Sequence, residues 1–131
     1  MSTTTEKFNK KYTEVVKIIE KNFADLKGGE KMLISSPRSI ANYIAKIPYG
    51  TEKSVKLIRL ELAENANADN TCPLTCGIFL RIAIEQSLEQ SNGAKPDLLF
   101  WRVIDRNGSL IKKLPISEKY LTELKSSEGL K

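Results

Sequence analysis

The stretch PLTCGIFLRIAIEQSLEQ, residues 73 to 90, decides the fold that this sequence predicts. Pro73 suits the first turn of a helix, where its fixed backbone angle fits and its missing N–H would have no partner. The residues that follow are apolar around most of the helix circumference for at least three turns. A helix of this kind is buried, so we expect it to run through the core with one exposed edge.

Two shorter helices are predicted upstream of this central helix. Ser35 or Ser36 can cap a helix whose first turn holds Pro37 and which stops before Gly50. Another helix runs from about Ser54 to Glu64, with apolar residues on one face and cations close by. The polar segment NANADNT then links it to the central helix.

The N-terminal 31 residues predict an appendage to a main domain formed by residues 32 to 131. Residues 1 to 5, MSTTT, are typical of a frayed tail. Apolar residues then recur at three- and four-residue intervals, as on one face of an amphipathic helix, until the segment KGGEK ends the pattern. They are Phe8, Tyr12, Val15, Val16, Ile19 and Phe23. We expect this helix to pack on the main domain.

The segment LLFWRVIDRNGSL, residues 98 to 110, predicts a β-hairpin. It joins an apolar, aromatic run to an Asn-Gly turn signal. Two consecutive helices, a polar linker and a hairpin are the parts of a winged helix-turn-helix. The expected fold class is therefore mostly α with a small β-hairpin, arranged like a winged helix-turn-helix. The same parts also fit a protein-interaction module or a purely structural one.

Charge and composition set further limits on function. The chain of 131 residues has the size of one domain, and its formal net charge of +5 favours an anionic partner. Most of this charge lies in residues 1 to 50, since residues 51 to 131 carry twelve Lys and Arg against eleven Asp and Glu. No apolar run approaches the roughly 20 residues that span a bilayer, and no signal-peptide segment follows Met1. We expect a cytoplasmic protein without a membrane partner.

The chain contains no histidine, which severely narrows the catalytic and metal-binding chemistry open to it. Neither a Ser-His nor a Cys-His nucleophile pair is possible. A zinc site would need Cys72 and Cys76 together with carboxylates, an uncommon set of ligands. We therefore expect two reduced, structural thiols, no metal and no cofactor.

Several segments, in this order, resemble the alkylguanine-DNA alkyltransferases, the methylated-DNA protein-cysteine methyltransferases. IAKIPYGTEKSVKLIRLELAE (44–64) looks like the start of that family's DNA-binding domain. FWRVIDRNGSL (100–110) falls where the family carries its cysteine motif PCHRVV, and YLTELKSSEGL (120–130) falls where it carries its closing helix. CPLTCGIFLRIA (72–83), followed by WRVI, is more closely similar to alkyltransferase-like proteins that lack the acceptor cysteine. The resemblance covers roughly residues 32 to 130.

The resemblance implies a DNA-binding fold, but the catalytic motif is replaced. In the family, the motif cysteine takes an alkyl group from the exocyclic oxygen of guanine, and the adjacent histidine helps to deprotonate it. Phe100 stands at the cysteine position and Trp101 at the histidine position, and neither can act as nucleophile or base. We therefore expect a protein that is not an enzyme. Alkyl transfer to Cys76 is a further alternative, which predicts a mass increase with alkylated DNA.

The resemblance also assigns candidate binding residues. The hypothesis is a non-catalytic, repair-related protein that binds duplex DNA and recognises alkylated or otherwise damaged bases. The residues expected to contact DNA are Lys53, Ser54, Lys56, Leu74, Thr75, Cys76 and Arg102, and those expected to line a base pocket are Phe100, Trp101 and Val103. The alternative is a degenerate scaffold that binds a protein partner and not DNA. A basic stripe along the two helices favours DNA, and an apolar patch there favours a protein partner.

Overall fold

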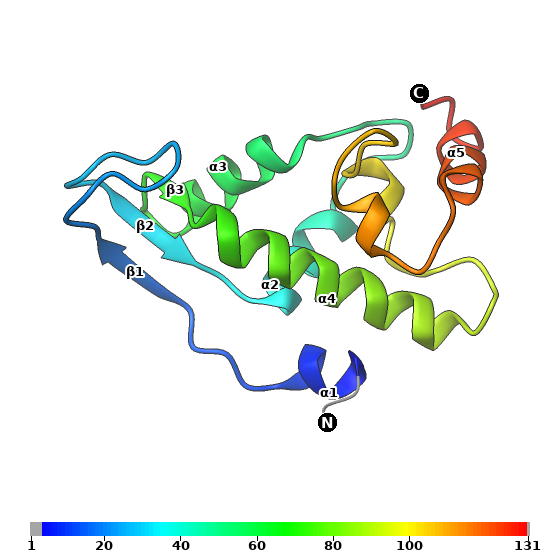
Figure 1. Ribbon diagram of the computed structural model, residues 1–131, viewed down its shortest axis with the longest axis horizontal. Helices are drawn as coiled ribbons and strands as arrows, with labels where there is room; N and C mark the ends of the chain where they lie inside the picture. The colour runs from blue at the N-terminus through cyan, green and yellow to red at the C-terminus, as the bar shows by residue number, and fades with distance from the viewer. Residues whose placement is uncertain (1–3, 131) are drawn as a thin grey trace.

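The computed structural model describes residues 4–130, in which helices surround the predicted central helix and a small sheet lies at one end (Figure 1). The α-helices are α1 (Thr4–Asn9), α2 (Pro37–Ala45), α3 (Val55–Asn65), α4 (Pro73–Ser91) and α5 (Glu118–Ser126). The strands are β1 (Val15–Ile18), β2 (Lys31–Ile34) and β3 (Asn70–Thr71), and two short 3₁₀ helices are η1 (Phe100–Arg102) and η2 (Ile111–Lys113). The fold class is therefore mostly α with a small sheet.

The three helices predicted between residues 35 and 91 are confirmed. Each begins at its expected start and ends within a few residues of its expected end. The Ser36 side chain accepts a hydrogen bond from the backbone N–H of Ser39 and caps α2, in which Pro37 is the first residue. The Ser54 hydroxyl accepts from the N–H of Leu57 and caps α3 in the same way. These caps satisfy N–H groups that a helix start leaves without partners.

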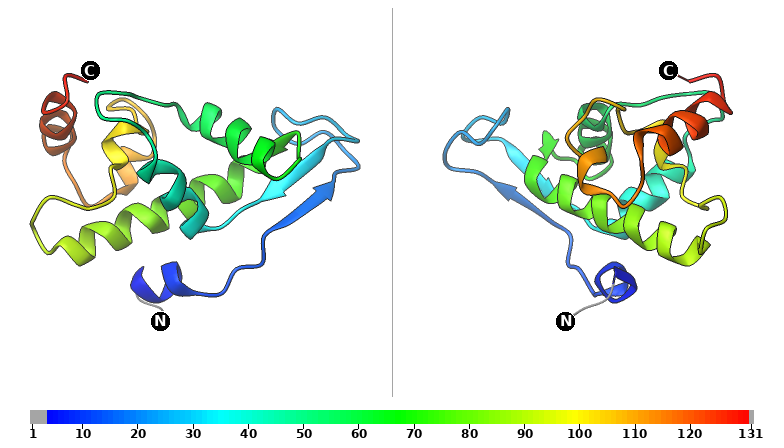
Figure 2. Two further views of the ribbon diagram at one scale, coloured as in Figure 1. Left: turned by 180° about the vertical axis from the view of Figure 1, so that it is seen from behind. Right: turned by 45° about the vertical axis from the view of Figure 1, so that its right-hand side comes forward.

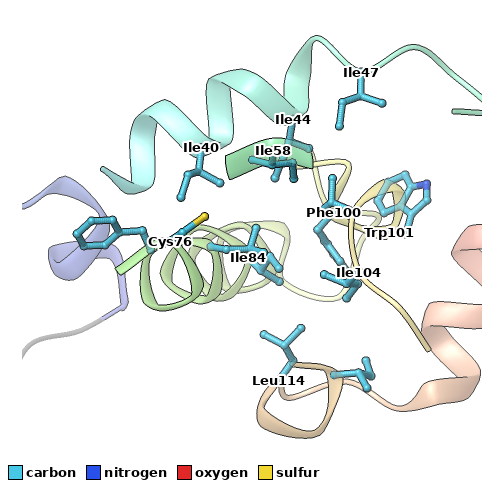
Figure 3. Close-up of a cluster of buried hydrophobic side chains, with 14 of the residues drawn as sticks. Ile40, Ile44, Ile47, Ile58, Cys76, Ile84, Phe100, Trp101, Ile104 and Leu114 are labelled. Atoms are coloured by element: carbon cyan, nitrogen blue, oxygen red, sulfur yellow. The ribbon is translucent and has the colours of Figure 1, made fainter. Parts of the chain in front are cut away.

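The core forms where α2, α3 and α4 meet the segment that contains η1. Ile44 of α2 and Ile84 of α4 are fully buried, and Ile58 of α3 and the rings of Phe100 and Trp101 complete the same cluster (Figure 3). The two rings meet edge to face, with centroids 5.6 Å apart. Burial of such large apolar side chains supplies most of the driving force for folding.

The sheet has the strand order β1-β2-β3 and joins the N-terminal segment to the main domain. β1 pairs antiparallel with β2, with Val15 opposite Ile34 and Ile18 opposite Lys31. β2 pairs parallel with β3, in the linker between α3 and α4. The boundary expected between residues 31 and 32 falls inside β2, so the sheet includes residues from both sides of it.

The helix predicted over residues 8 to 23 is wrong for most of its length. α1 ends at Asn9, and residues 15 to 18 form a strand instead. The segment VVKII is rich in β-branched residues, which lose side-chain freedom in a helix and suit a pleated strand. Of the expected tail, residues 1–3 lie outside the described residues, and Thr4 and Thr5 belong to α1.

The hairpin predicted after the central helix is also wrong. Residues 100–102 and 111–113 form 3₁₀ helices, and the only antiparallel strand pair among residues 4–130 is β1 with β2. Phe100 to Ile104 are all buried, whereas a strand with one face in water would alternate. The Asn-Gly signal still marks a turn, closed by a hydrogen bond from Gly108 N to Asp105 O of 3.2 Å.

Within residues 4–130, no helix combines the length and the apolar character that crossing a membrane requires.

Candidate nucleic-acid interface

A cleft of about 820 Å³ lies beside the start of α3, the first half of α4 and the segment from Val103 to Lys113. Three separate parts of the chain therefore supply its walls. Five of the predicted site residues line it: Lys53, Ser54, Lys56, Leu74 and Val103. The structure thus brings together residues that the sequence places up to 50 positions apart.

Side chains at the start of α3 shape one wall of the cleft. Ser54 caps α3, so its hydroxyl is already engaged with the backbone. The Lys53 ammonium forms an ion pair with Glu61 at 2.9 Å, and the hydroxyl of Tyr43 donates to the same carboxylate oxygen. Hydrogen bonds from Tyr43 and Lys53 hold the pKa of Glu61 below its usual range. Lys56, one turn along from Lys53, is exposed.

Both apolar and cationic side chains line the cleft. Leu74 of α4 is 63% exposed and Ile78, one turn further along, also faces solvent. Arg81 lies on the same side of α4, where it pairs with Glu85, and Lys113 of η2 is exposed. The lining carboxylates include Glu52, paired with Lys125, and Asp105.

Arg102 is a buried structural residue rather than a surface cation. Its Nε and Nη2 atoms donate to the carboxylate of Glu128 at 2.8 and 2.9 Å, and its Nη1 atom donates to the carbonyl oxygen of Ile47 at 2.6 Å. Side-chain exposure is only 7% for Arg102 and 2% for Glu128. The guanidinium is therefore not available to a phosphate, in contrast to the prediction for this residue.

Glu128 receives hydrogen bonds from two further donors besides Arg102. The indole N–H of Trp101 donates to it at 2.7 Å and the backbone N–H of Gly50 at 2.9 Å. Burial by itself raises the pKa of Glu128, but the donors from Arg102, Gly50 and Trp101 outweigh it and lower the pKa from 4.5 to about 2. The carboxylate is therefore ionised throughout the neutral range and ties the C-terminal end of the chain to η1 and to the residues after α2.

The predicted base pocket is filled by the protein itself. Phe100 and Trp101 are 0% exposed and belong to the hydrophobic core, so neither ring is open to a base. Adjacent residues of a strand would point to opposite faces, but the 3₁₀ turn of η1 directs both rings inward. Val103 is the only one of the three predicted pocket residues that lines the cleft.

Thr75 and Cys76 belong to the inner sides of α4 and do not line the cleft. The Thr75 hydroxyl is enclosed and has no hydrogen-bond partner among residues 4–130. Cys76 is buried in the main core, and its burial raises the pKa of the thiol to about 11. A thiol that stays protonated and enclosed is a poor nucleophile, so the geometry does not support alkyl transfer to Cys76.

Some of the residues that complete the cleft were not among those predicted from the sequence. Ile78 and Arg81 follow Leu74 by four and seven positions, the spacing that places side chains on one helix face, so this signal was present. Lys113 could not be found in this way, because its position depends on the path of the segment after η1.

Among the described residues there is no group of three or more His, Cys, Asp or Glu that could hold a metal ion. Comparisons of the chain with protein-family models, with curated proteins and with solved structures found no match.

Proposed function

We propose that this protein binds duplex DNA at the cleft between α3, α4 and the segment 103–113, without catalysing a reaction. One observation carries the proposal: the cleft gathers Lys53, Ser54, Lys56, Leu74 and Val103 from three parts of the chain. The sequence predicted DNA contacts for four of these residues and a place in the base pocket for Val103. In this proposal, α3 and α4 act as the helix pair, and the segment 103–113 takes the place of a wing.

Charge supports phosphate contacts at the sides of the cleft. Lys56 and Lys113 line it from different elements and are both exposed. Arg106 and Lys112, which are exposed next to lining residues, add positive charge to the same segment. The start of α3 contributes backbone N–H groups and the positive end of a helix dipole. Cations and helix starts of this kind position a protein on a duplex without reading its sequence.

Leu74 and Ile78 support contacts to the groove, where apolar side chains contact the edges of bases or enter between them. The same two residues favour the second candidate function, which is recognition of a protein partner, because apolar surface of this kind also supports protein interfaces. Binding of damaged bases would have to use the cleft itself, since the rings of Phe100 and Trp101 are buried.

The test is fluorescence anisotropy with a plain duplex and with a duplex that carries guanine methylated on its exocyclic oxygen. We expect binding that weakens with salt, because each phosphate contact releases counterions. The double variant Lys56→Glu, Lys113→Glu should bind about tenfold or more weakly and with a shallower salt dependence. Lys119→Glu, at an exposed position in α5, is the matched control and should bind like the unmodified protein.

The outcomes separate the two candidate functions. No binding of either duplex at micromolar protein would overturn the DNA proposal and favour a protein partner. Equal losses in the double variant and in the control would place the DNA contact away from the cleft. Tighter binding of the methylated duplex would extend the proposal to damaged bases.

A further inference from the structure

The outer edge of β1 is an unpaired strand edge with a defined set of free backbone groups. β1 lies at one end of the strand order, and no described strand pairs with its other side. Figures 1 and 2 show β1 and β2 reaching away from the helices, so this edge is not covered by a helix. Such edges are templates for pairing with another extended segment.

The register fixes which residues offer their backbone groups outward. Lys31 O and Leu33 O accept hydrogen bonds at 2.8 Å from Asp69 N and Cys72 N on the β3 side, so Met32 and Ile34 face β1. Met32 and Ile34 lie opposite Lys17 and Val15. Because bonding alternates along an antiparallel pair, Val16 and Ile18 point their N–H and C=O groups to the free edge.

The side chains of the same two residues form an apolar surface beside this edge. Ile18 is 68% exposed and Val16 is 43% exposed, and both lie on one face of the sheet. Lys17 lies between them, exposed, on the other face. The edge therefore combines free backbone groups, two apolar side chains and one central cation.

Lys17 makes a second copy of β1 a poor partner for this edge. In the antiparallel register that places Val16 opposite Ile18 of the other copy, so that both present their backbone groups to the shared edge, Lys17 lies opposite Lys17, and like charges directly opposite are destabilising. An edge lysine is a common way to prevent self-association through a strand. A partner with a carboxylate at that position would instead form a favourable cross-strand pair.

One further cation, Lys31, and two carboxylates, Glu14 and Glu20, lie near the edge. Lys31 of β2 lies opposite Ile18 and is exposed. Glu14, just before β1, accepts a hydrogen bond from the Ser39 hydroxyl at 2.8 Å, and Glu20 lies beyond the end of the strand. Lys17 is thus the only charged side chain within β1 itself.

We propose that the outer edge of β1 pairs with an extended segment of a partner protein in which an acidic residue alternates with apolar residues. The partner's acidic residue lies opposite Lys17, and its apolar neighbours lie beside Val16 and Ile18. Backbone hydrogen bonds from Val16 and Ile18 supply affinity, and the alternate side chains supply specificity, as in other cases of strand addition. This proposal does not depend on the function of the cleft.

The test uses the full chain and a blocked heptapeptide that alternates valine with glutamate. Two-dimensional ¹H–¹⁵N NMR should show peptide-dependent shifts at residues 15 to 18, and hydrogen exchange should slow at the amides of Val16 and Ile18. A peptide with lysine in place of glutamate should bind more weakly. Lys17→Glu should reverse this preference and weaken the glutamate peptide roughly three- to tenfold. Lys119→Glu, exposed in α5, is the matched control and should leave both affinities unchanged.

Three results would overturn the proposal. One is the absence of shifts at residues 15 to 18 at millimolar peptide. Another is equal binding of the two peptides, which would show that Lys17 selects nothing. The third is a dimer in sedimentation equilibrium that Ile18→Asp disrupts, which would assign the edge to a second copy of the chain.

Discussion

Glu128→Gln is expected to destabilise the protein strongly, although it removes no atom of the side-chain skeleton. The carboxylate is 2% exposed and accepts hydrogen bonds from Arg102, Trp101 and Gly50. The neutral amide leaves the charge of Arg102 buried without a counterion and turns an NH₂ group toward these donors. Removing the charge of one partner from a buried ion pair lowers the free energy of unfolding by about 3–5 kcal/mol.

The pKa of Glu128 also indicates how much stability its ionised form contributes. Folding lowers this pKa from 4.5 to about 2, a difference that corresponds to roughly 3 kcal/mol. Because the folded-state pKa is the lower one, this stability is fully present above about pH 5 and is lost as the pH falls toward 2. A loss of this size is large beside a typical total stability of about 5–15 kcal/mol.

The assay is urea unfolding at pH 7 and at a series of values down to pH 3, followed by circular dichroism. Glu128→Gln should lower the free energy of unfolding by about 3 kcal/mol at pH 7 and flatten its dependence on pH below 5. Glu123→Gln, at an exposed position in α5, should change it by less than about 0.5 kcal/mol. A change below 1 kcal/mol in Glu128→Gln, or an unaltered slope below pH 5, would refute the assigned role of this ion pair.

Three further predictions test the core, a helix cap and the thiols. Ile44→Ala should lower the free energy of unfolding by about 2–5 kcal/mol in chemical denaturation, because the side chain is fully buried, whereas Ile18→Ala at the exposed edge should cost far less; similar losses would contradict the assigned burial. Ser36→Ala should cost about 1 kcal/mol in the same assay by removing the cap of α2, and a neutral result would mean that the cap contributes nothing. Cys76 should resist a thiol reagent at pH 8 until urea unfolds the chain, since burial raises its pKa to about 11, and rapid labelling of the native protein would contradict this.

Helices α2, α3 and α4 could be predicted from the sequence because their signals are local. Pro37 and Pro73 mark two helix starts, serines cap two helices, and an apolar run defines α4. The strands could not be predicted in this way. β1 is only four residues long, and its apolar residues fit a helical spacing as well as a strand. Pairing with β2, which lies thirteen residues further along, decides between the two.

In the candidate site, too, the residues placed by local sequence signals could be predicted, and those placed by distant contacts could not. Ser54 and Lys56 could be placed near a helix start from the sequence alone, and the structure has them there. That both Phe100 and Trp101 are buried could not be foreseen, because it depends on the 3₁₀ turn of η1 and on distant partners such as Glu128, which lies 27 residues beyond Trp101 and accepts the indole hydrogen bond. A motif match aligned these positions with a reactive strand, but it carried no information on which face of the fold they occupy.

The buried ion pair also indicates where function can lie in this protein. A ligand that bound the guanidinium of Arg102 would have to separate it from Glu128, at a cost similar to that of breaking the pair by mutation. That cost would weaken such a ligand greatly, since 3–5 kcal/mol is a factor of roughly 150 to 4,000 in affinity. The segment that corresponds by resemblance to the reactive strand therefore holds the fold together. The two surfaces proposed for binding, the cleft beside α3 and α4 and the free edge of β1, need no such rearrangement.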